Sequence, residues 1–598
     1  MIQNNFHDKE VDLLVIGAGA AGMSAALFSK LNGLDVLLCE KASQVGGTTA
    51  TSGGTIWAPG SHLSAEAGVP DDINQARIFL KSVVGDRGGD LIREAFLESS
   101  PQMIRDLSEQ TSVKLNPCLE HPDYIKNQPG EALGGRALAP AEFDGRLLGS
   151  DFKYVLPPRA EFMGLGGMMV NRNELNALLN PFSSDSNFMT TLKVVLPYFL
   201  SRLRFSRGTR LVMGNALVGS LFYNLKRHNV PVWLDSALKE LITENGQVIA
   251  AKIQTPDGII TVKTRKGIVL ATGGIGWNQQ LRAQLFPKGM IDDSLSPQSN
   301  TGDGLTLASQ IGAQIDPSVD SSVLYFPCSI HTHKNGYKAI WPHIILDRAK
   351  PGVIAVNSDG KRFVNESDSY HDFCMAQVKS NSGKEKIVSY LICDQAAIQK
   401  YGLGFVLPGA KKLNYFLQEK YLFSAPTVKA LAQKVGINSA GLEKTIQRFN
   451  TLVDQGEDTD FGKGSGVMNR FNGDPEVKQN PCLGKLDQGP YYALPVIPMD
   501  CASCGGLAGD EFGRILDSKN QVIEGLFACG NDLSSIFKGT YPGPGTTIGP
   551  GMVFAWRIAQ FTAGKLSDKS IENLISNTDI DPFHSKNQQN PQQERTAV

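Results

Sequence analysis

The sequence lacks any apolar run long enough to cross a bilayer, which takes about 20 residues. Its first ten residues are polar and lack the apolar core of a secretory signal. The 598-residue chain has a formal net charge of only −1, so no long-range field attracts a nucleic acid, and no nucleic-acid-binding motif is present. These absences predict a cytoplasmic protein without a nucleic-acid partner.

The sequence has few cysteines, and their spacing matches no disulfide framework. The nine cysteines are an odd number scattered along the chain, which is typical of reduced thiols in a cytoplasmic protein. Cys501 and Cys504 form the only CxxC pair, and no second pair follows to complete a zinc site. We therefore expect no metal.

A strand–turn–helix–strand unit is predicted at residues 11–41. One apolar run ends at Gly17, an Ala-rich helical segment follows, and a second apolar run ends at Glu40. Gly17 permits the tight turn, Gly19 lets the backbone approach a pyrophosphate, and Gly22 lets the helix pack on the strand. Glu40 stands at about the 20-residue spacing of an acid that holds ribose hydroxyls. The unit predicts a dinucleotide site without choosing between nicotinamide and flavin.

The next segment, residues 41–54, favours a flavin. It holds two glycine pairs, Gly46–Gly47 and Gly53–Gly54, with hydroxyl residues between them. Such a chain can pass close to a large flat ring and donate backbone N–H groups to it. Nicotinamide-dependent dehydrogenases do not usually carry this segment, so FAD is the predicted cofactor.

Later glycine turns divide the chain into segments. Buried strands at 266–275 and 525–532 each run into such a turn, and residues 539–550 open a further helix. From about 321 to 487 strands and helices are mixed without a phosphate-type glycine turn, and the chain is too long for one core. The predicted class is therefore α/β: a Rossmann-type FAD-binding domain with an inserted α+β catalytic domain. The predicted parts are 8–320 (first FAD-binding segment, with an insertion at 151–212), 321–487 (catalytic domain), 488–566 (second FAD-binding segment) and 576–598 (disordered tail).

The insertion contains a basic, apolar stretch. No acidic residue occurs from Ser186 to Leu234, whereas basic residues are interleaved with large apolar ones at 188–207. Such a segment is suited to peripheral contact with a membrane surface, its arginines near anionic lipid. The alternative is a helical pair that packs on the domain with solvated basic residues, because Pro197 would break the helix and apolar residues also pack cores.

Several motifs together resemble a known family. The fingerprint, the segment at 46–54 and the strand–glycine turn at 526–531 are similar to the flavoprotein subunits of fumarate reductase and succinate dehydrogenase. Within that superfamily, three further motifs resemble the 3-ketosteroid Δ1-dehydrogenases, and each contributes to that family's active site. These motifs are Pro122–Tyr124, Asn365–Tyr370 and Tyr541–Gly545.

The resemblance implies a chemistry for each motif. Tyr541 and the backbone N–H of Gly545 would polarise the ketone as an oxyanion-hole pair. Tyr370 would remove the proton from carbon 2, and Tyr124 would hydrogen-bond to it and favour its phenolate, because a free tyrosine has a pKa of about 10. A hydride would then pass from carbon 1 to FAD. The implied partners are an apolar cyclic ketone, expected to be a 3-ketosteroid, and an unidentified electron acceptor.

The glycine turns and the resemblance together predict the FAD contacts. No histidine occurs at 48–54, where the respiratory enzymes tether flavin covalently, so noncovalent FAD is expected. The predicted contact residues are Gly17, Gly19, Ala20, Ala21, Gly22, Glu40, Lys41, Gly46, Gly47, Thr48, Thr49, Ser52, Gly53, Gly54, Ala271, Thr272, Gly273, Gly274, Asp303, Gly530, Asn531, Thr547 and Ile548.

Three alternatives remain open at this point. A fumarate-type reductase would need cationic residues to clamp two carboxylates. A 3-ketosteroid Δ4-(5α)-dehydrogenase would act on the same class of steroid but introduce the double bond at a different position. An electron-transfer or membrane-associated flavoprotein would have no small substrate and no use for the three tyrosines. The candidates for a dicarboxylate clamp are His331, His333, His343, His371, Arg348 and Arg362.

Overall fold

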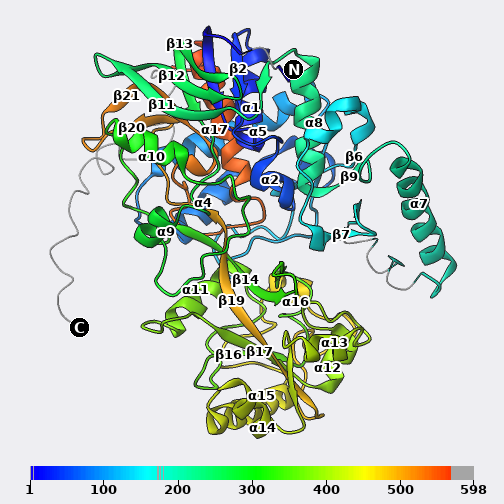
Figure 1. The fold of residues 1–598 in the computed structure, drawn as a ribbon. Coiled ribbons are helices and arrows are strands. Elements are labelled where there is room, and N and C mark those ends of the chain that lie inside the picture. The colour runs from blue at the N-terminus through cyan, green and yellow to red at the C-terminus, as the bar shows by residue number, and fades with distance from the viewer. Residues whose placement is uncertain (1, 4–5, 172–173, 175–176, 179–180, 568–598) are drawn as a thin grey trace.

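A computed structural model describes residues 2–3, 6–171, 174, 177–178 and 181–567. The disordered tail predicted at 576–598 lies outside these residues. The protein has a larger body containing the first sheet and a smaller one containing the second, joined where strands β14 and β19 run between them (Figure 1).

The first sheet is the Rossmann-type core predicted from the fingerprint. Strand β1 (Lys9–Ile16) pairs in parallel with β2 (Val36–Cys39) and β13 (Gly258–Leu270), and β13 pairs in parallel with β21 (Val522–Ala528). The apolar runs of these strands are buried, as expected for parallel strands covered on both faces. The sheet is completed by β10 (Val232–Trp233), β11 (Ala237–Glu244), β12 (Gln247–Thr255) and β20 (Arg514–Leu516).

Small residues bring two helices close to this sheet. Helix α1 (Ala20–Leu31) starts directly after the glycine turn and packs against α17 (Ile548–Thr562). A Cβ on Gly22 would lie 1.8 Å from the carbonyl oxygen of Gly17, so only glycine permits this contact. Both helix N-termini therefore reach the carboxyl ends of the parallel strands, where α/β proteins bind their ligands.

The second sheet is antiparallel and carries its own core. Its order is β15 (Lys338–Pro342), β14 (Val323–Thr332), β19 (Tyr491–Ser503), β17 (Ser389–Cys393) and β16 (Val353–Val356), and β18 (Phe423–Ala425) also pairs with β19. Helices α14 (Val428–Val435) and α15 (Ser439–Gln455) pack on it through a separate apolar cluster. The α/β class with two sheets agrees with the prediction.

The position of β19 corrects the predicted boundary at residue 487. That boundary assigned residues 491–503 to the FAD-binding domain, whereas the strand pairs with β14 and β17 of the second sheet. Its pairing partners lie about 65 to 180 residues away in the sequence, so no local pattern identified its sheet. We place the return to the FAD-binding domain after Ser503.

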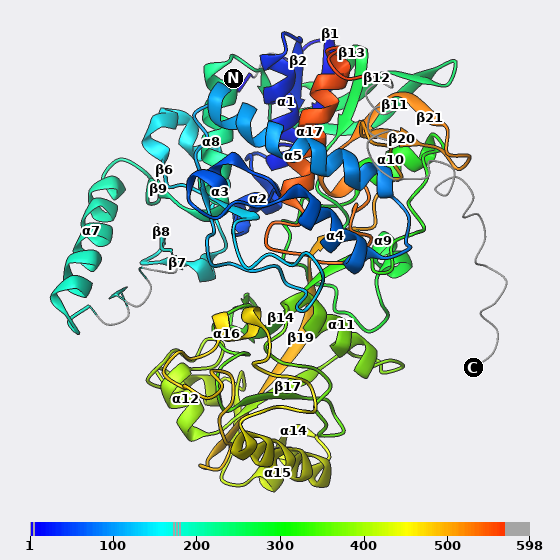
Figure 2. The same cartoon turned by 180° about the vertical axis from the view of Figure 1, so that it is seen from behind.

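Other elements complete the two bodies. The helices are α2 (Gly47–Thr51), α3 (His62–Glu66), α4 (Ile73–Val84), α5 (Asp90–Gln110), α8 (Met213–Arg227), α9 (Gln279–Leu285), α10 (Asp303–Gln310), α11 (Tyr370–Ser380), α12 (Gln395–Tyr401), α13 (Leu413–Gln418) and α16 (Val467–Asn472), with 3-10 helices η1 (Gly145–Tyr154), η2 (Ala160–Phe162) and η3 (Gly530–Asp532). The strands are β3 (Ile56–Trp57), β4 (Leu115–Pro117), β5 (Ala137–Pro140), β6 (Phe143–Asp144), β7 (Met163–Gly164), β8 (Met168–Met169) and β9 (Arg210–Leu211). Seen from behind, α4 and α5 cover the larger body (Figure 2).

Helix α7 (Asp185–Arg202) projects from the larger body (Figures 1 and 2). The predicted break at Pro197 is wrong, because the helix continues through this residue. Only Val194 and Tyr198 of the helix are buried, and they pack against Met168 of β8, so one narrow side of the helix contacts the insertion, as the alternative proposed, and the rest is exposed. Apolar side chains exposed on or just after it are Phe188, Met189, Leu192, Leu196, Phe199, Leu200 and Leu203. Among the described residues, no helix combines the length and apolar character needed to span a membrane.

Candidate active site

One cavity of about 420 Å³ lies between the glycine turns of the first sheet and the β14–β19 end of the second. Tyr124, Tyr370, Tyr541 and Gly545 all line it. So do the predicted FAD contacts, with the exception of Gly22, Gly46 and Gly274. Segments that are more than 500 residues apart in the sequence therefore meet at one site.

The three exceptions lie behind the cavity wall. A Cβ on Gly22 would clash with the Gly17 carbonyl, one on Gly46 would lie 2.8 Å from the Ala50 Cβ, and one on Gly274 would lie 2.1 Å from the Ser503 Oγ. These glycines let neighbouring segments approach, so their role in the cradle is indirect.

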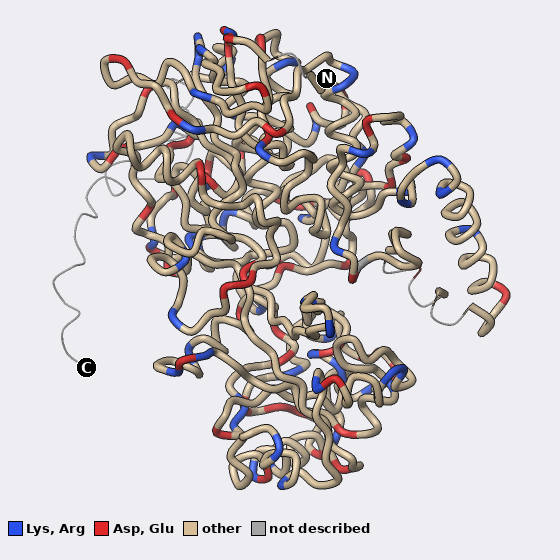
Figure 3. The backbone as a smooth tube through the Cα atoms, viewed as in Figure 1, with Lys and Arg blue, Asp and Glu red and all other residues tan. Residues whose placement is uncertain are grey.

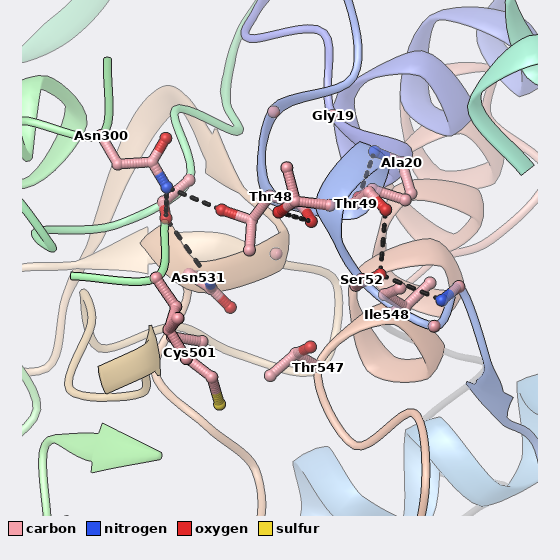
Figure 4. A pocket seen from close by; sticks show the side chains of 18 of the residues that line it. Gly19, Ala20, Thr48, Thr49, Ser52, Asn300, Cys501, Asn531, Thr547 and Ile548 are labelled. Carbon is pink, nitrogen blue, oxygen red and sulfur yellow. Dashed lines mark hydrogen bonds between the residues drawn. The ribbon is translucent and has the colours of Figure 1, made fainter. Parts of the chain in front are cut away.

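The cradle has the features that FAD requires. The first residues of α1, α2 and α17 line the cavity, which directs helix N-termini and backbone N–H groups toward an anionic or electron-rich ligand. The Thr49 hydroxyl accepts a hydrogen bond from the Ala20 backbone N–H at 3.2 Å (Figure 4). The segment predicted to pass beside the flavin is thus tied to the phosphate turn.

Asn300 was missed by sequence reasoning. Its Nδ2 donates to the Thr48 hydroxyl at 3.0 Å and to the Gly273 carbonyl at 2.8 Å (Figure 4). It therefore joins two glycine-rich segments that surround the cavity. A single asparagine in a loop, three residues before α10, gives no local signal of this function.

Glu40 and Lys41 have different positions in the cradle. The Glu40 carboxylate accepts hydrogen bonds from the backbone N–H groups of Ala18 and Ala42 at 2.7 and 2.8 Å. Burial raises the pKa of Glu40, and these hydrogen bonds oppose the shift. Its remaining lone pairs are available to ribose hydroxyls. Lys41 is ion-paired with Asp303 at 2.7 Å, which fixes the start of α10.

The three tyrosine rings contact one another. Tyr370 is the first residue of α11, while Tyr124 and Tyr541 lie in loops from the larger body. Their ring centroids are 5.2 to 5.6 Å apart. The Tyr124 backbone N–H donates to the Pro542 carbonyl at 2.8 Å, which fixes the two loops together. Sequence motifs separated by about 170 to 420 residues therefore form one aromatic cluster.

The hydrogen bond between Tyr370 and Tyr124 exists, but its direction differs from the expectation. The Tyr370 hydroxyl donates to the Tyr124 hydroxyl at 3.3 Å. Burial, the neighbouring Tyr124 and Tyr541 and this donated bond raise the pKa of Tyr370 well above 10. Burial also raises the pKa of Tyr124, against the hydrogen bond it accepts. Hydroxyl groups can rotate, so a bound ketone can reverse this bond without moving either ring.

Gly545 meets the requirements of a carbonyl-binding residue. Its φ is +96°, and a Cβ would lie 2.5 Å from both the Thr55 carbonyl oxygen and the Trp57 nitrogen. Within the described part of the chain, its N–H donates to no protein acceptor. The position therefore needs glycine and presents a backbone donor at the cavity wall.

His371 connects the base candidate to the oxyanion candidate. Its Nδ1 accepts from the Tyr325 backbone N–H at 3.3 Å, so its Nε2–H donates to the Gly539 carbonyl at 3.0 Å. Burial lowers the pKa of His371 to about 4. The neutral imidazole thus holds the first turn of α11 against the loop that carries Tyr541.

A buried ion pair supports the Tyr124 loop. The Asp123 carboxylate contacts the Arg136 Nη1 at 2.6 Å and accepts from the Trp57 indole N–H at 3.0 Å. Burial raises the pKa of Asp123 to about 6, and its partners only partly oppose this. The pair attaches the residue beside Tyr124 to the segment that follows the glycine-rich loop.

The cavity wall facing the tyrosines is largely apolar. Phe326 lies edge-on to Tyr370 with centroids 4.4 Å apart. Further lining residues that sequence reasoning did not identify include Pro158, Arg159, Met169, Val170, Met213, Leu295, Pro342, Ile344, Ile345, Cys501 and Ala502. A flat apolar ketone fits such a wall, since ligand sites of this kind need few polar groups.

The cationic residues expected of a dicarboxylate clamp lie elsewhere. Among the described lining residues there is none of the six candidates. Arg362 is ion-paired with Glu366 and Asp458, and Arg348 donates to backbone carbonyls. Nor do the described His, Cys, Asp and Glu side chains form a group that could hold a metal ion.

Comparison with known proteins gives the family. The family model described as FAD binding domain matches residues 12–548. The chain is 33% identical to 4-oxocyclohex-2-ene-1-carboxylate 5-dehydrogenase of Sinomonas cyclohexanicum, covering 92% of this chain and 93% of that protein. It is also 33% identical to 3-oxosteroid 1-dehydrogenase of Mycolicibacterium smegmatis, covering 92% and 97% respectively.

A solved structure agrees in fold over nearly the whole chain. The crystal structure of 3-ketosteroid delta1-dehydrogenase from Sterolibacterium denitrificans in complex with 1,4-androstadiene-3,17-dione has a TM-score of 0.86 and 32% identity. The match covers 93% of this chain and all of that one.

Proposed function

Because this chain belongs to the FAD binding domain family, and within it to the flavoproteins that include the 3-oxosteroid 1-dehydrogenases, we propose that it dehydrogenates a 3-ketosteroid or a related cyclic ketone between carbons 1 and 2. The observation that carries the proposal is the convergence of Tyr124, Tyr370, Tyr541 and Gly545 on the cavity that holds the FAD cradle.

Carbonyl polarisation is assigned to Tyr541 and Gly545. The Tyr541 hydroxyl and the Gly545 N–H would donate to the ketone oxygen, where negative charge develops as carbon 2 loses its proton. Each donor acts in an apolar cavity, so the hydrogen bonds are stronger than they would be in water. A donor pair of this kind acidifies the hydrogen on carbon 2.

Proton abstraction is assigned to Tyr370. Its raised pKa in the ligand-free cavity means that it needs help to act as a base near neutral pH. A Tyr124 hydroxyl turned to donate to Tyr370 would stabilise the phenolate, which reverses the bond present without ligand. FAD, held noncovalently, supplies the acceptor for the hydride that leaves carbon 1. An acceptor outside this chain must then remove the electrons.

An anaerobic titration with 4-androstene-3,17-dione tests this function. Bleaching of the visible flavin band with formation of the 1,4-diene is the expected result. A product desaturated at the ring junction, from a saturated 3-ketosteroid, would indicate the Δ4-(5α) reaction instead. No bleaching by any ketone, with reoxidation of the dithionite-reduced protein by fumarate, would overturn the proposal.

We further propose that this protein is cytoplasmic and contacts a membrane surface through residues 188–207. Helix α7 exposes large apolar side chains, and residues 186–204 include Lys193, Arg202 and Arg204 but no acidic residue. Figure 3 shows blue segments along α7 and a red one only at its end. A second cavity of about 650 Å³ lies beneath α7, and Met169 lines both this cavity and the active site. This arrangement favours delivery of a lipid-dissolved ketone.

A further inference from the structure

Arg159 is a charged residue in an otherwise apolar part of the active-site cavity. Charged side chains among the described lining residues are those of Glu40, Lys41, Asp303 and Arg159. The first three gather at the FAD cradle, where Lys41 and Asp303 are ion-paired. Arg159 comes instead from the insertion, beside Pro158 and before η2. The FAD cradle therefore does not account for this guanidinium.

Arg159 lies on the side of the cavity that faces the second sheet. Its neighbour Glu161 accepts hydrogen bonds from the Ile340 backbone N–H and the Tyr337 hydroxyl of the β14–β15 hairpin. Burial raises the pKa of the Cys328 thiol on β14, and the positive charge of Arg159 partly opposes this. Arg159 thus lies on the side of the cavity formed by β14 and β15, which also contribute Phe326 and Pro342 to its wall.

The guanidinium retains donors that the described residues do not use. The Arg159 Nη2 lies 3.5 Å from the Glu161 Oε1, longer than the 2.7 to 2.9 Å of a charged hydrogen bond. That oxygen is already occupied by Tyr337 and Ile340. The Arg159 Nε is buried and has no hydrogen-bond partner among the described residues, although the side chain as a whole is 20% exposed.

A buried donor without a partner costs free energy unless a ligand satisfies it. A guanidinium presents a planar fork that matches a carboxylate with two parallel hydrogen bonds. We propose that Arg159 binds a carboxylate carried by the ketone substrate at a point away from its reacting carbonyl. The substrate class is therefore a cyclic ketone acid: a 3-ketosteroid with a carboxylated side chain or a carboxylated oxocyclohexene.

This inference rests on the proposed ketone dehydrogenation and makes Arg159 a specificity-determining residue. The name of one relative, a dehydrogenase of 4-oxocyclohex-2-ene-1-carboxylate, is consistent with such a substrate. Tyr370 and Tyr541 would act on the ketone as before, whereas Arg159 would set which ketones are held there.

A matched pair of ketones separates charge from shape. The KM and kcat of the FAD-loaded full chain are measured with 3-oxo-4-androstene-17β-carboxylate and with its methyl ester, and likewise with 4-oxocyclohex-2-ene-1-carboxylate and its methyl ester. The expected result is a KM lower for one acid than for its ester by about ten- to a hundredfold, the range of one hydrogen bond to a charged group. Whichever acid shows the preference identifies the carboxylate source.

Substitutions assign the preference to the residue. Arg159→Gln should abolish the preference for the acid over the ester, while Arg159→Lys should restore part of that preference. The control is Arg448→Gln, which removes an exposed guanidinium on α15 that is paired with Asp460. It should retain the full preference.

The outcomes distinguish the two proposals. Turnover of esters with no acid preference in the wild type, or a preference that survives Arg159→Gln, would overturn the assignment of Arg159 and leave ketone dehydrogenation standing. Absence of flavin bleaching with all four ketones would instead overturn the proposed function itself.

Discussion

A tyrosine can act as a base only where its surroundings stabilise the phenolate, and in the ligand-free cavity those of Tyr370 do not. Burial and the neighbouring Tyr124 and Tyr541 hydroxyls raise its pKa in the ligand-free cavity. The barrier to proton transfer must therefore be lowered on the ketone, whose carbon-2 hydrogen becomes more acidic when the ketone oxygen is bound. The base and the oxyanion donors are interdependent, which explains why their loops are fixed together at Tyr124 and Pro542.

Replacing Tyr370 by phenylalanine removes the proposed base and preserves the ring packing. We expect Tyr370→Phe to retain bound FAD and to lose roughly 10²- to 10⁴-fold in kcat, the usual contribution of a positioned general base. The measurements are the flavin absorption spectrum and steady-state turnover of 4-androstene-3,17-dione. Tyr325→Phe is the matched control, since Tyr325 is equally buried but does not line the cavity among the described residues. Equal turnover in both variants would refute the assignment.

His371 predicts a pH dependence of stability. Its pKa is lowered from 6.5 to about 4, so the stability it contributes is present above pH 6.5 and is lost as pH falls through 4. The shift corresponds to at most about 3 kcal/mol. The free energy of unfolding, measured with urea, should fall more between pH 7 and pH 5 for the wild type than for His371→Gln. Because both proteins share all other titrating groups, an identical pH dependence would contradict the neutral buried imidazole.

At the scale of elements, the glycine turns could be predicted and the strand pairing could not. A turn such as Gly17–Gly22 is specified by its own residues, because backbone approach and positive φ are local requirements. Strand β19 is specified by partners about 65 to 180 residues away, so its sheet was assigned wrongly. Arg159 was missed for a related reason: a single arginine in an insertion has no pattern until the fold places it at the cavity.

Pro197 shows how context overrides a local rule. Proline in a helix interior removes one hydrogen bond and was expected to end α7, yet the helix spans Asp185–Arg202. Tyr198 beside it is buried, whereas Leu196 and Phe199 are exposed, so the helix keeps an apolar face that the described fold does not cover.

The exposed face of α7 predicts membrane binding. Replacing Leu196 and Phe199 by serine should abolish co-sedimentation with vesicles of anionic phospholipid, since each apolar side chain lost weakens insertion. Turnover of a detergent-solubilised ketone should be unchanged, because neither residue lines the active-site cavity among the described residues. The paired change Ile78→Ser and Ile259→Ser, at exposed residues of the larger body, is the control. Vesicle binding that is equal in all three proteins would exclude α7 as the contact.

At the scale of the whole molecule, the active site lies between the two bodies and is lined by both. The FAD cradle comes from turns of the first sheet, while Tyr370 and the apolar wall come from segments around the second sheet. Neither body forms the cavity alone. The ligand-filled cavity should therefore stabilise the association of the two bodies as well as the cradle itself.

Removal of FAD tests this coupling. Bound FAD should stabilise the native state by RT ln(1 + [FAD]/Kd), about 2.7 kcal/mol at a free concentration 100 times Kd. Amide hydrogen exchange of the apo protein should increase at 46–54 and 271–274, and also around Tyr370, because the cavity adjoins all three. Helices α14 and α15 provide an internal control, since they have a separate apolar cluster and lie at the end of the smaller body away from the larger one (Figure 1), and they should exchange equally in both forms. Increased exchange confined to the cradle would mean that the two bodies associate independently of FAD, whereas an increase that includes Tyr370 would make the cofactor a structural part of the substrate site.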